Sequence, residues 1–146
     1  MPLNLCDTNI WLALALSGHG LHAAARDWLN TIQAPASVLF CRSTQQSFLR
    51  LLTNPAVLGA YGCPPLTNRQ AWKAYSSFLD DDRIVLKPEP AGLERRWGEY
   101  AKRDTASAKL WMDSYLAAFA QTGGFRMVTN DTAFRQFDGL QLLLLI

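Results

Sequence analysis

The 146-residue sequence is poor in features that would fix its class at once. It has only three cysteines, Cys6, Cys41 and Cys63, which match neither a disulfide framework nor a zinc spacing. We therefore expect reduced thiols in a cytosolic protein. A net charge of only +2 permits a polyanionic partner without indicating one. The sequence contains no P-loop, no GxSxG motif and no DxDxT motif, and no glycine-rich turn follows its first apolar run.

Long apolar runs are also missing. The stretch from Ile10 to Leu16 and the closing LQLLLLI are too short to span a membrane, and no basic segment precedes the first. We therefore expect neither a membrane helix nor a signal peptide. The hydrophobic fraction of 49% is typical of a globular protein. Without repeats or linkers, residues 1–146 are predicted to form a single domain.

Short apolar strands alternate with amphipathic helices along the chain. Strands are expected over residues 3–6, 38–41, 84–86, 125–129 and 140–146. Helices are expected over residues 10–16, 21–32, 44–52, 70–79, 93–102 and 108–121. This pattern predicts an α/β fold, a three-layer sandwich with a mostly parallel central sheet between helices. In such folds the functional site lies beyond the carboxyl ends of the strands.

Three aspartates stand where that rule places a site. Asp7 follows the first expected strand, Asp131 follows the fourth, and Asp113 lies inside the otherwise apolar helix KLWMDSYLAAFA. Three converging carboxylates repel one another unless they are protonated or bridged by a cation, and Mg²⁺ suits a sparse acidic cluster. Taken singly, Asp7 and Asp131 are explained as well by capping, and Asp113 by a solvent-facing position. Their joint placement favours a site.

These residues, in this order, resemble those of the PIN-domain nucleases, most closely the VapC-like toxins of type II toxin–antitoxin systems. The resemblance covers nearly the whole chain, through LCDTNIWLAL, FLRLLTNP, DSYLAAFAQTGGFRMVTNDTAF and the closing apolar strand. It implies a catalytic metal site in which Asp7 and Asp113 bind Mg²⁺ or Mn²⁺ and Asp131 binds metal or positions water. Supporting polar roles are implied for Thr8, Asn9 and Thr129.

The resemblance also implies an activity and partners. The activity is metal-dependent cleavage of phosphodiester bonds in structured or single-stranded RNA, with transfer RNA one candidate. The partners are a cognate antitoxin and a second copy in a homodimer, in the cytoplasm and without a membrane. One position departs from the family, because Gln46 or Ser47 stands where most members have a glutamate. The site then has one carboxylate fewer, which leaves an alternative: an RNA-binding or antitoxin-bound PIN-like module with an inactive site.

Other polar and aromatic residues have competing interpretations. A basic stretch leads into the Asp113 helix and either contacts phosphates or forms a solvated helix face; it comprises Arg95, Arg96, Lys102, Arg103 and Lys109. Lys109 either pairs with Asp104 or reaches the scissile phosphate. The acidic run of residues 80–82 precedes a strand and is expected to be a solvated turn. His19 and His22 are expected at the surface. Core packing is expected for most tryptophans, with dimer contacts open for Trp28, Trp72 and Trp111 and base stacking for Trp11 and Trp97.

Overall fold

The computed structural model describes residues 2–146 and contains a five-stranded sheet in which all paired strands run parallel. The strands are β1 (Asn4–Cys6), β2 (Val38–Phe40), β3 (Ile84–Leu86), β4 (Arg126–Thr129) and β5 (Gln141–Leu144). Each is short and apolar, as strands buried on both faces of a parallel sheet are. The predicted mostly parallel sheet is therefore confirmed.

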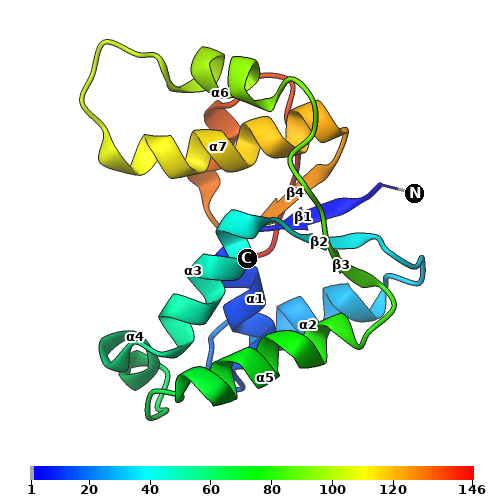
Figure 1. Ribbon diagram of the computed structural model, residues 1–146, viewed down its shortest axis with the longest axis vertical. Coiled ribbons are helices and arrows are strands. Elements are labelled where there is room, and N and C mark those ends of the chain that lie inside the picture. The colour runs from blue at the N-terminus through cyan, green and yellow to red at the C-terminus, as the bar shows by residue number, and fades with distance from the viewer. Residues whose placement is uncertain (1) are drawn as a thin grey trace.

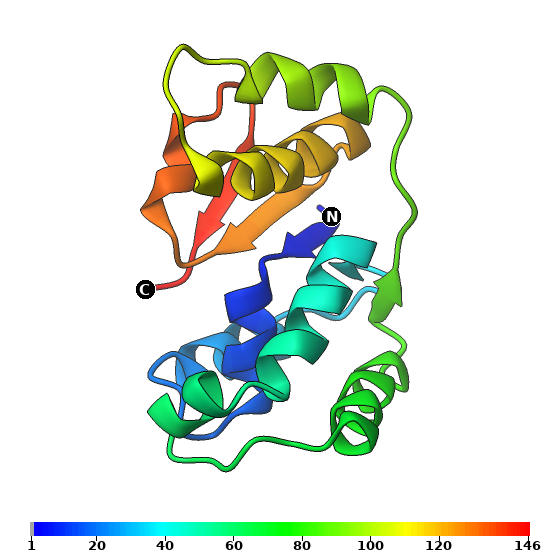
Figure 2. The ribbon, with the colours of Figure 1, turned by 60° about the vertical axis from the view of Figure 1, so that its left-hand side comes forward.

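Helices cover both faces of this sheet, so the molecule has the predicted three layers (Figures 1 and 2). One face carries α1 (Thr8–Ala15), α2 (His22–Asn30), α3 (Arg42–Leu52), α4 (Pro55–Ala60) and α5 (Asn68–Leu79). The other carries α6 (Leu93–Ala101), α7 (Ala108–Gly123) and the short 3₁₀ helix η1 (Thr132–Gln136). Gly124 ends α7 in the left-handed conformation, which glycine adopts without steric cost.

Strand side chains alternate between two separate hydrophobic cores. Val38 and Phe40 of β2 pack into the core beneath α1–α5, whereas Leu39 between them packs into the core beneath α6 and α7. In β4, Val128 and Met127 divide in the same way. Because successive strand residues point to opposite faces, each strand needs apolar residues at every position. This explains why the strands read as continuous apolar runs.

The strand order positions the functional edge of the sheet. The order is β3-β2-β1-β4-β5, so the chain builds outward from β1 in one direction and then returns to place β4 on its other side. The helices that follow β1 and β4 lie on opposite faces, which opens a crevice at the carboxyl ends of these two strands. Asp7 and Asp131 are the residues that leave those ends.

Several sequence-based expectations need correction. The segment after TNP contains the helix α4, which begins with Asn54 as its cap and Pro55 at its first position. Trp72 and Trp111 are not core residues, because 55% and 58% of their surfaces are exposed. Trp28 is buried, and Trp11 is fully buried against Phe40 with ring centroids 3.7 Å apart, so Trp11 does not stack on a base.

The acidic run before β3 forms the expected turn away from the carboxyl edge. Asp81 holds Arg83 through two carboxylate oxygens, and the guanidinium of Arg83 also donates to the carbonyls of Leu29 and Ile32 at the end of α2. The turn is thus a structural clamp between α2 and β3. Within residues 2–146, no helix is long and apolar enough to cross a membrane.

Candidate active site

Asp7 leaves the end of β1 and begins α1. Its Oδ1 accepts a hydrogen bond from the Thr8 amide at 2.8 Å, so it is the N-terminal cap of the helix. Its Oδ2 accepts a second bond, at 2.7 Å, from the hydroxyl of Thr129 at the end of β4. The capping role and the site role are therefore not alternatives, because one oxygen performs each.

Thr129 connects two of the three acids. Its side chain is fully buried, and its hydroxyl donates to Asp7 while accepting the backbone amide of Asp131 at 3.1 Å. Asp131 in turn caps η1 by accepting the amide of Ala133 at 2.9 Å. The adjacent parallel strands β1 and β4 thus deliver both carboxylates to one place, and a buried hydroxyl fixes their separation.

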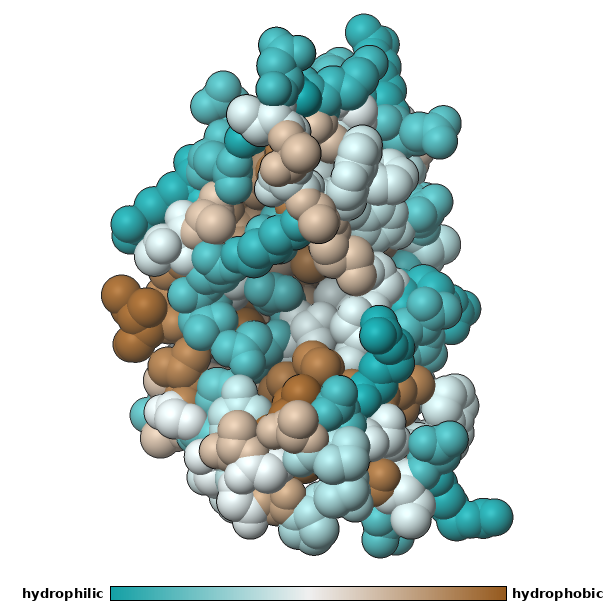
Figure 3. Space-filling model, turned by 90° about the vertical axis from the view of Figure 1, so that its left-hand side faces the viewer, coloured by the Kyte–Doolittle hydropathy of each residue, from teal (hydrophilic) through white to brown (hydrophobic). Residues whose placement is uncertain are grey.

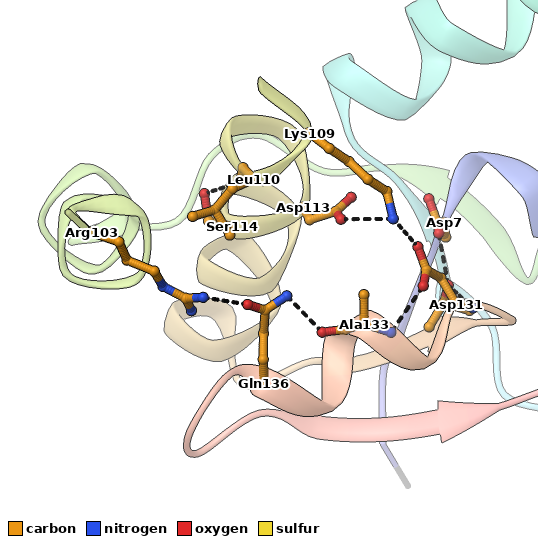
Figure 4. Close-up of polar contacts among 10 residues, drawn as sticks. Asp7, Arg103, Lys109, Leu110, Asp113, Ser114, Asp131, Ala133 and Gln136 are labelled. Atoms are coloured by element: carbon orange, nitrogen blue, oxygen red, sulfur yellow. Dashed lines mark hydrogen bonds and ion pairs between the residues drawn. The ribbon is translucent and has the colours of Figure 1, made fainter. Parts of the chain in front are cut away.

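Asp113 reaches the carboxyl ends of β1 and β4 from the helix layer that contains α7. It lies in the second turn of α7, and only 14% of its side chain is exposed. Figure 4 shows Asp113 and Asp131 pointing toward the ammonium group of Lys109, with Asp7 behind Asp131. The Lys109 Nζ lies 2.6 Å from Asp131 Oδ2 and 3.4 Å from Asp113 Oδ2. Of the two alternatives for Lys109, pairing with Asp104 is wrong, because the lysine contacts Asp113 and Asp131 instead.

The three carboxyl groups have unequal pKa values. Burial raises the pKa of Asp7 above its usual range; the bonds from Thr129 and Thr8 oppose this, and the charges of Asp113 and Asp131 add to it. Burial likewise raises the pKa of Asp113, against the influence of Lys109. The hydrogen bond from Lys109 lowers the pKa of Asp131. Asp7 and Asp113 therefore gain most from a nearby positive charge.

Asn9 belongs to a hydrogen-bonded chain behind the acids rather than to the acids themselves. Its Nδ2 donates to Asn130 Oδ1 at 3.0 Å, and its Oδ1 lies 2.9 Å from His19 Nε2. The Leu21 amide donates to His19 Nδ1, which leaves Nε2 as the protonated nitrogen that donates to Asn9. The expected surface position of His19 is wrong, since the residue is 8% exposed. These hydrogen bonds among His19, Asn9 and Asn130 stabilise the β4–η1 turn that carries Asp131.

The remaining sequence-predicted residues have smaller contacts. Thr8 gives its backbone amide to Asp7. Gln46 is exposed and Ser47 is half-buried. The hydroxyl of Ser43, one helical turn before Ser47, donates to the Met112 sulfur at 3.3 Å, next to Asp113. Both positions lie one helical turn from Ser43, three and four residues on, and Ser47 is the more buried of the two.

The donor set at this edge fits a hard divalent ion, with water completing its coordination. Carboxylate oxygens are the ligands that Mg²⁺ and Mn²⁺ accept, and Mg²⁺ is commonly held by one or two of them. Burial raises the pKa of Asp7 and of Asp113, so a nearby cation would favour the ionised form of both carboxyl groups. Within residues 2–146, however, no three histidine, cysteine or acidic side chains form a ready-made cage for a metal. The site therefore fits an open ion site rather than a closed one.

Two adjoining hollows extend from the acids along the loop between α6 and α7. One, of about 160 Å³, is lined by Lys109 and Asp113 and by Arg103 of the loop. The next, of about 350 Å³, shares Arg103 and is also lined by Lys102 and Trp111. Over this part of the molecule the surface in Figure 3 is largely hydrophilic, and apolar side chains gather lower down. Basic side chains therefore line the edge of the site, whereas the three aspartates form its centre.

Comparison with known proteins identifies relatives of the whole chain. A family model described as the PIN domain matches residues 5–140. Ribonuclease VapC41 of Mycobacterium tuberculosis is 67% identical over 142 residues, which cover 97% of each chain. The crystal structure of M. tuberculosis VapC20, a Sarcin-Ricin loop cleaving toxin, matches 94% of this chain and 98% of that chain with a TM-score of 0.62 and 17% identity. DNA-bound VapBC from Salmonella typhimurium matches over 100% of both chains, with a TM-score of 0.67 and 16% identity.

Proposed function

The chain belongs to the PIN-domain family and, within it, to the VapC proteins, and from this premise we propose that it is a metal-dependent endoribonuclease and the toxin of a toxin–antitoxin pair. One observation carries the proposal: at the carboxyl ends of β1 and β4, Thr129 links Asp7 to the Asp131 turn, and Lys109 contacts both Asp131 and Asp113. The protein that shares 67% of its residues with this chain is itself called a ribonuclease.

In the proposed mechanism Asp7 and Asp113 would hold Mg²⁺ or Mn²⁺, as the resemblance to the family implies; burial raises the pKa of both, so a positive charge would favour their ionised forms. Such an ion, when bound, polarises the phosphoryl group and lowers the pKa of the attacking water. Asp131, more exposed and ionised at lower pH, orients that water or helps to hold the ion. Thr129 keeps Asp7 and the Asp131 turn in register, so the acids need little rearrangement during turnover.

An RNA substrate is supported by the basic rim of the acidic site. Phosphate contacts supply most of the affinity of nucleic-acid complexes and are made mainly by arginine and lysine. Arg103 lies at the junction of the two hollows, where its guanidinium donates to Gln136 and stacks over the ring of Phe137. This contact holds one donor and leaves others for a phosphate. The exposed indole of Trp111 lies at the same rim and offers a stacking face for a base.

We further propose a cognate antitoxin, a homodimeric assembly and action in the cytoplasm. The solved relative from S. typhimurium is a VapBC complex. This chain exposes apolar surface that a protein partner would cover, including Trp72 beside a hollow of about 420 Å³ between α3 and α5. Co-expression with a candidate antitoxin, followed by co-purification and mass measurement, tests both assemblies.

The test of the nuclease compares wild-type protein with Asp113→Asn, and uses Asp27→Asn as a control because Asp27 is an exposed acid on α2. Each protein is induced in bacteria without antitoxin, and the ends of cellular RNA are mapped. We expect growth arrest and discrete new RNA ends for wild type and Asp27→Asn, and neither for Asp113→Asn. Purified protein should cleave the mapped RNA in Mg²⁺ and stop when EDTA is added.

The same experiment distinguishes the inactive-module alternative. The missing glutamate at Gln46 or Ser47 and the lack of a three-ligand cage within residues 2–146 are the observations that favour it. A folded wild-type protein that produces no new RNA ends would establish that alternative. Cleavage that survives Asp113→Asn would contradict the assigned site and leave the nuclease activity to other residues.

A further inference from the structure

The ammonium group of Lys109 bridges two acids that come from different elements. Lys109 lies in the first turn of α7, four residues before Asp113, and its Nζ lies 2.6 Å from Asp131 Oδ2 on the far side. The side chain is 65% exposed, so it reaches inward from the rim rather than being enclosed. Figure 4 shows the Nζ between the two carboxylates.

This position is the one a cation of the proposed site would take. Lys109 lies four residues before Asp113, a spacing that brings the two side chains onto one helix face. An ordinary surface ion pair at this spacing consists of one lysine and one acid on the same helix. Here the shorter contact is instead to Asp131, 22 residues further along the chain. The lysine therefore neutralises the acids of the site across the crevice, in addition to pairing along its own helix.

We propose that Lys109 is an internal counter-ion, which competes with the divalent ion for Asp113 and Asp131 and thereby lowers metal affinity. The inference rests on the proposed metal site, and it assigns to Lys109 the control of how strongly that site binds the ion. An ammonium group and a divalent ion repel each other when both lie against the same carboxylates. This repulsion favours withdrawal of Lys109 when the ion binds, and its flexible four-carbon stem allows this.

The withdrawn ammonium group remains at the rim of the site. Lys109 lines the hollow that Arg103 also lines, where the phosphate of a bound nucleic acid would lie. The positive charge that bridges the two acids without metal is then available to a phosphate oxygen. Lys109 would therefore change its partner on metal binding.

The opposite role makes the opposite prediction. If Lys109 only oriented Asp113 and Asp131 for the metal, its removal would leave the carboxylates less well placed and weaken metal binding. If it competes, its removal strengthens binding. The sign of the change in metal affinity therefore decides between the two roles.

The experiment titrates Mn²⁺ into metal-stripped full-length protein by isothermal titration calorimetry, without RNA. Wild type is compared with Lys109→Met, a neutral side chain of similar length, and with Lys102→Met, which removes an equal charge from the neighbouring loop. We expect Lys109→Met to bind Mn²⁺ about fivefold more tightly, the size of one exposed ion pair. Lys102→Met should bind as wild type does. Unchanged or weaker binding by Lys109→Met would overturn the proposal.

Thermal unfolding supplies a second readout that does not depend on activity. Without metal, Lys109→Met should melt below wild type, because Asp113 and Asp131 then lack their counter-charge. With saturating Mn²⁺, its gain in melting temperature should exceed that of wild type. Lys109→Gln should behave alike, which guards against an artefact of one substitution.

The outcomes separate the inference from the proposed function. If wild type and Lys109→Met bind Mn²⁺ equally, the metal site stands and only the competition fails. If neither variant binds Mn²⁺ at millimolar concentration, the metal site itself fails and the inference fails with it. Binding seen only in Lys109→Met would be the strongest support, since the lysine would then exclude the ion.

Discussion

Replacing Thr129 by valine should uncouple the two strand-end acids while preserving the shape of the core. Valine keeps the volume of threonine and removes only the hydroxyl, which donates to Asp7 Oδ2 at 2.7 Å and accepts the Asp131 amide at 3.1 Å. Thr129 is fully buried, so water cannot easily replace either bond. The substitution therefore leaves a carboxylate oxygen and a backbone amide without their partner.

The expected loss follows from these two contacts. A hydrogen bond to a charged group contributes about 1.5–3 kcal/mol, and an unsatisfied buried amide costs about 1–3 kcal/mol. Because the added methyl group recovers part of this, we expect a net loss of about 3 kcal/mol in the free energy of unfolding. For a chain of this length, that corresponds to a fall of about 10 °C in melting temperature. Thr129→Ser keeps the hydroxyl and should lose only about 1 kcal/mol.

A pH profile tests whether the loss acts through Asp7. The Thr129 bond lowers the pKa of Asp7, so its removal raises that pKa further. If Asp7 binds the metal as proposed, its ionised form is the ligand, and the acidic limb of Mn²⁺ affinity should move to higher pH in Thr129→Val but not in Thr129→Ser. Thermal melts in EDTA and Mn²⁺ titrations across pH measure both effects. Equal melting temperatures and identical acidic limbs for the two variants would refute this account of Thr129.

Three further predictions concern other parts of the molecule. Arg83→Met should lower the free energy of unfolding by about 2 kcal/mol in urea titrations, because a half-buried carboxylate and two carbonyls lose their donor; an unchanged midpoint would contradict the clamp between α2 and β3. The folded-state pKa values of Asp7 and Asp113 are raised above 3.8. In metal-free protein both carboxyl groups therefore stabilise the folded state at low pH, where they are protonated. This stabilisation is lost as the pH rises through their folded pKa values. Neutralising either with asparagine should therefore raise, or at least preserve, the melting temperature at pH 7 in EDTA, and a large fall would show that the carboxylate is structural. Ser47→Glu should tighten Mn²⁺ binding and lower the metal-free melting temperature, whereas no change in either would place Ser47 outside the site.

The sequence was sufficient for the sheet and for the meeting of two acids. Apolar runs that end in Asp7 and Asp131 read as buried parallel strands, and parallel strands bring their carboxyl ends to one edge. Asp113 could be added because an acid inside an apolar helix needs a partner. These inferences rest on local pattern and on the general geometry of parallel sheets, which is why the structure agrees with them.

The contacts that tune the site were not predictable in the same way. The local pattern around Lys109 offered Asp104 as a partner, yet the observed partner is Asp131, brought close only when η1 folds against α7. His19 reads as a loop residue, but its buried position depends on Asn9 and Asn130, the latter more than a hundred residues away. Such contacts depend on the packing of distant elements, for which a single sequence carries no periodic signal. The helix α4 differs: no helix was expected between residues 53 and 69, although Asn54 followed by Pro55 is a recognisable cap signal.

Charge balance bears on how the proposed site would function without the glutamate that most of the family carries. Without metal, the ammonium group of Lys109 offsets one of three carboxylates; once it withdraws, a single divalent ion would neutralise two of the three negative charges. A fourth carboxylate at Ser47 would leave a further negative charge and call for more cation at the same edge. The uncharged Ser47 and the bridging Lys109 thus act in the same direction, because both lower the positive charge that the site needs. We therefore expect this chain to use one ion, held in competition with its own lysine.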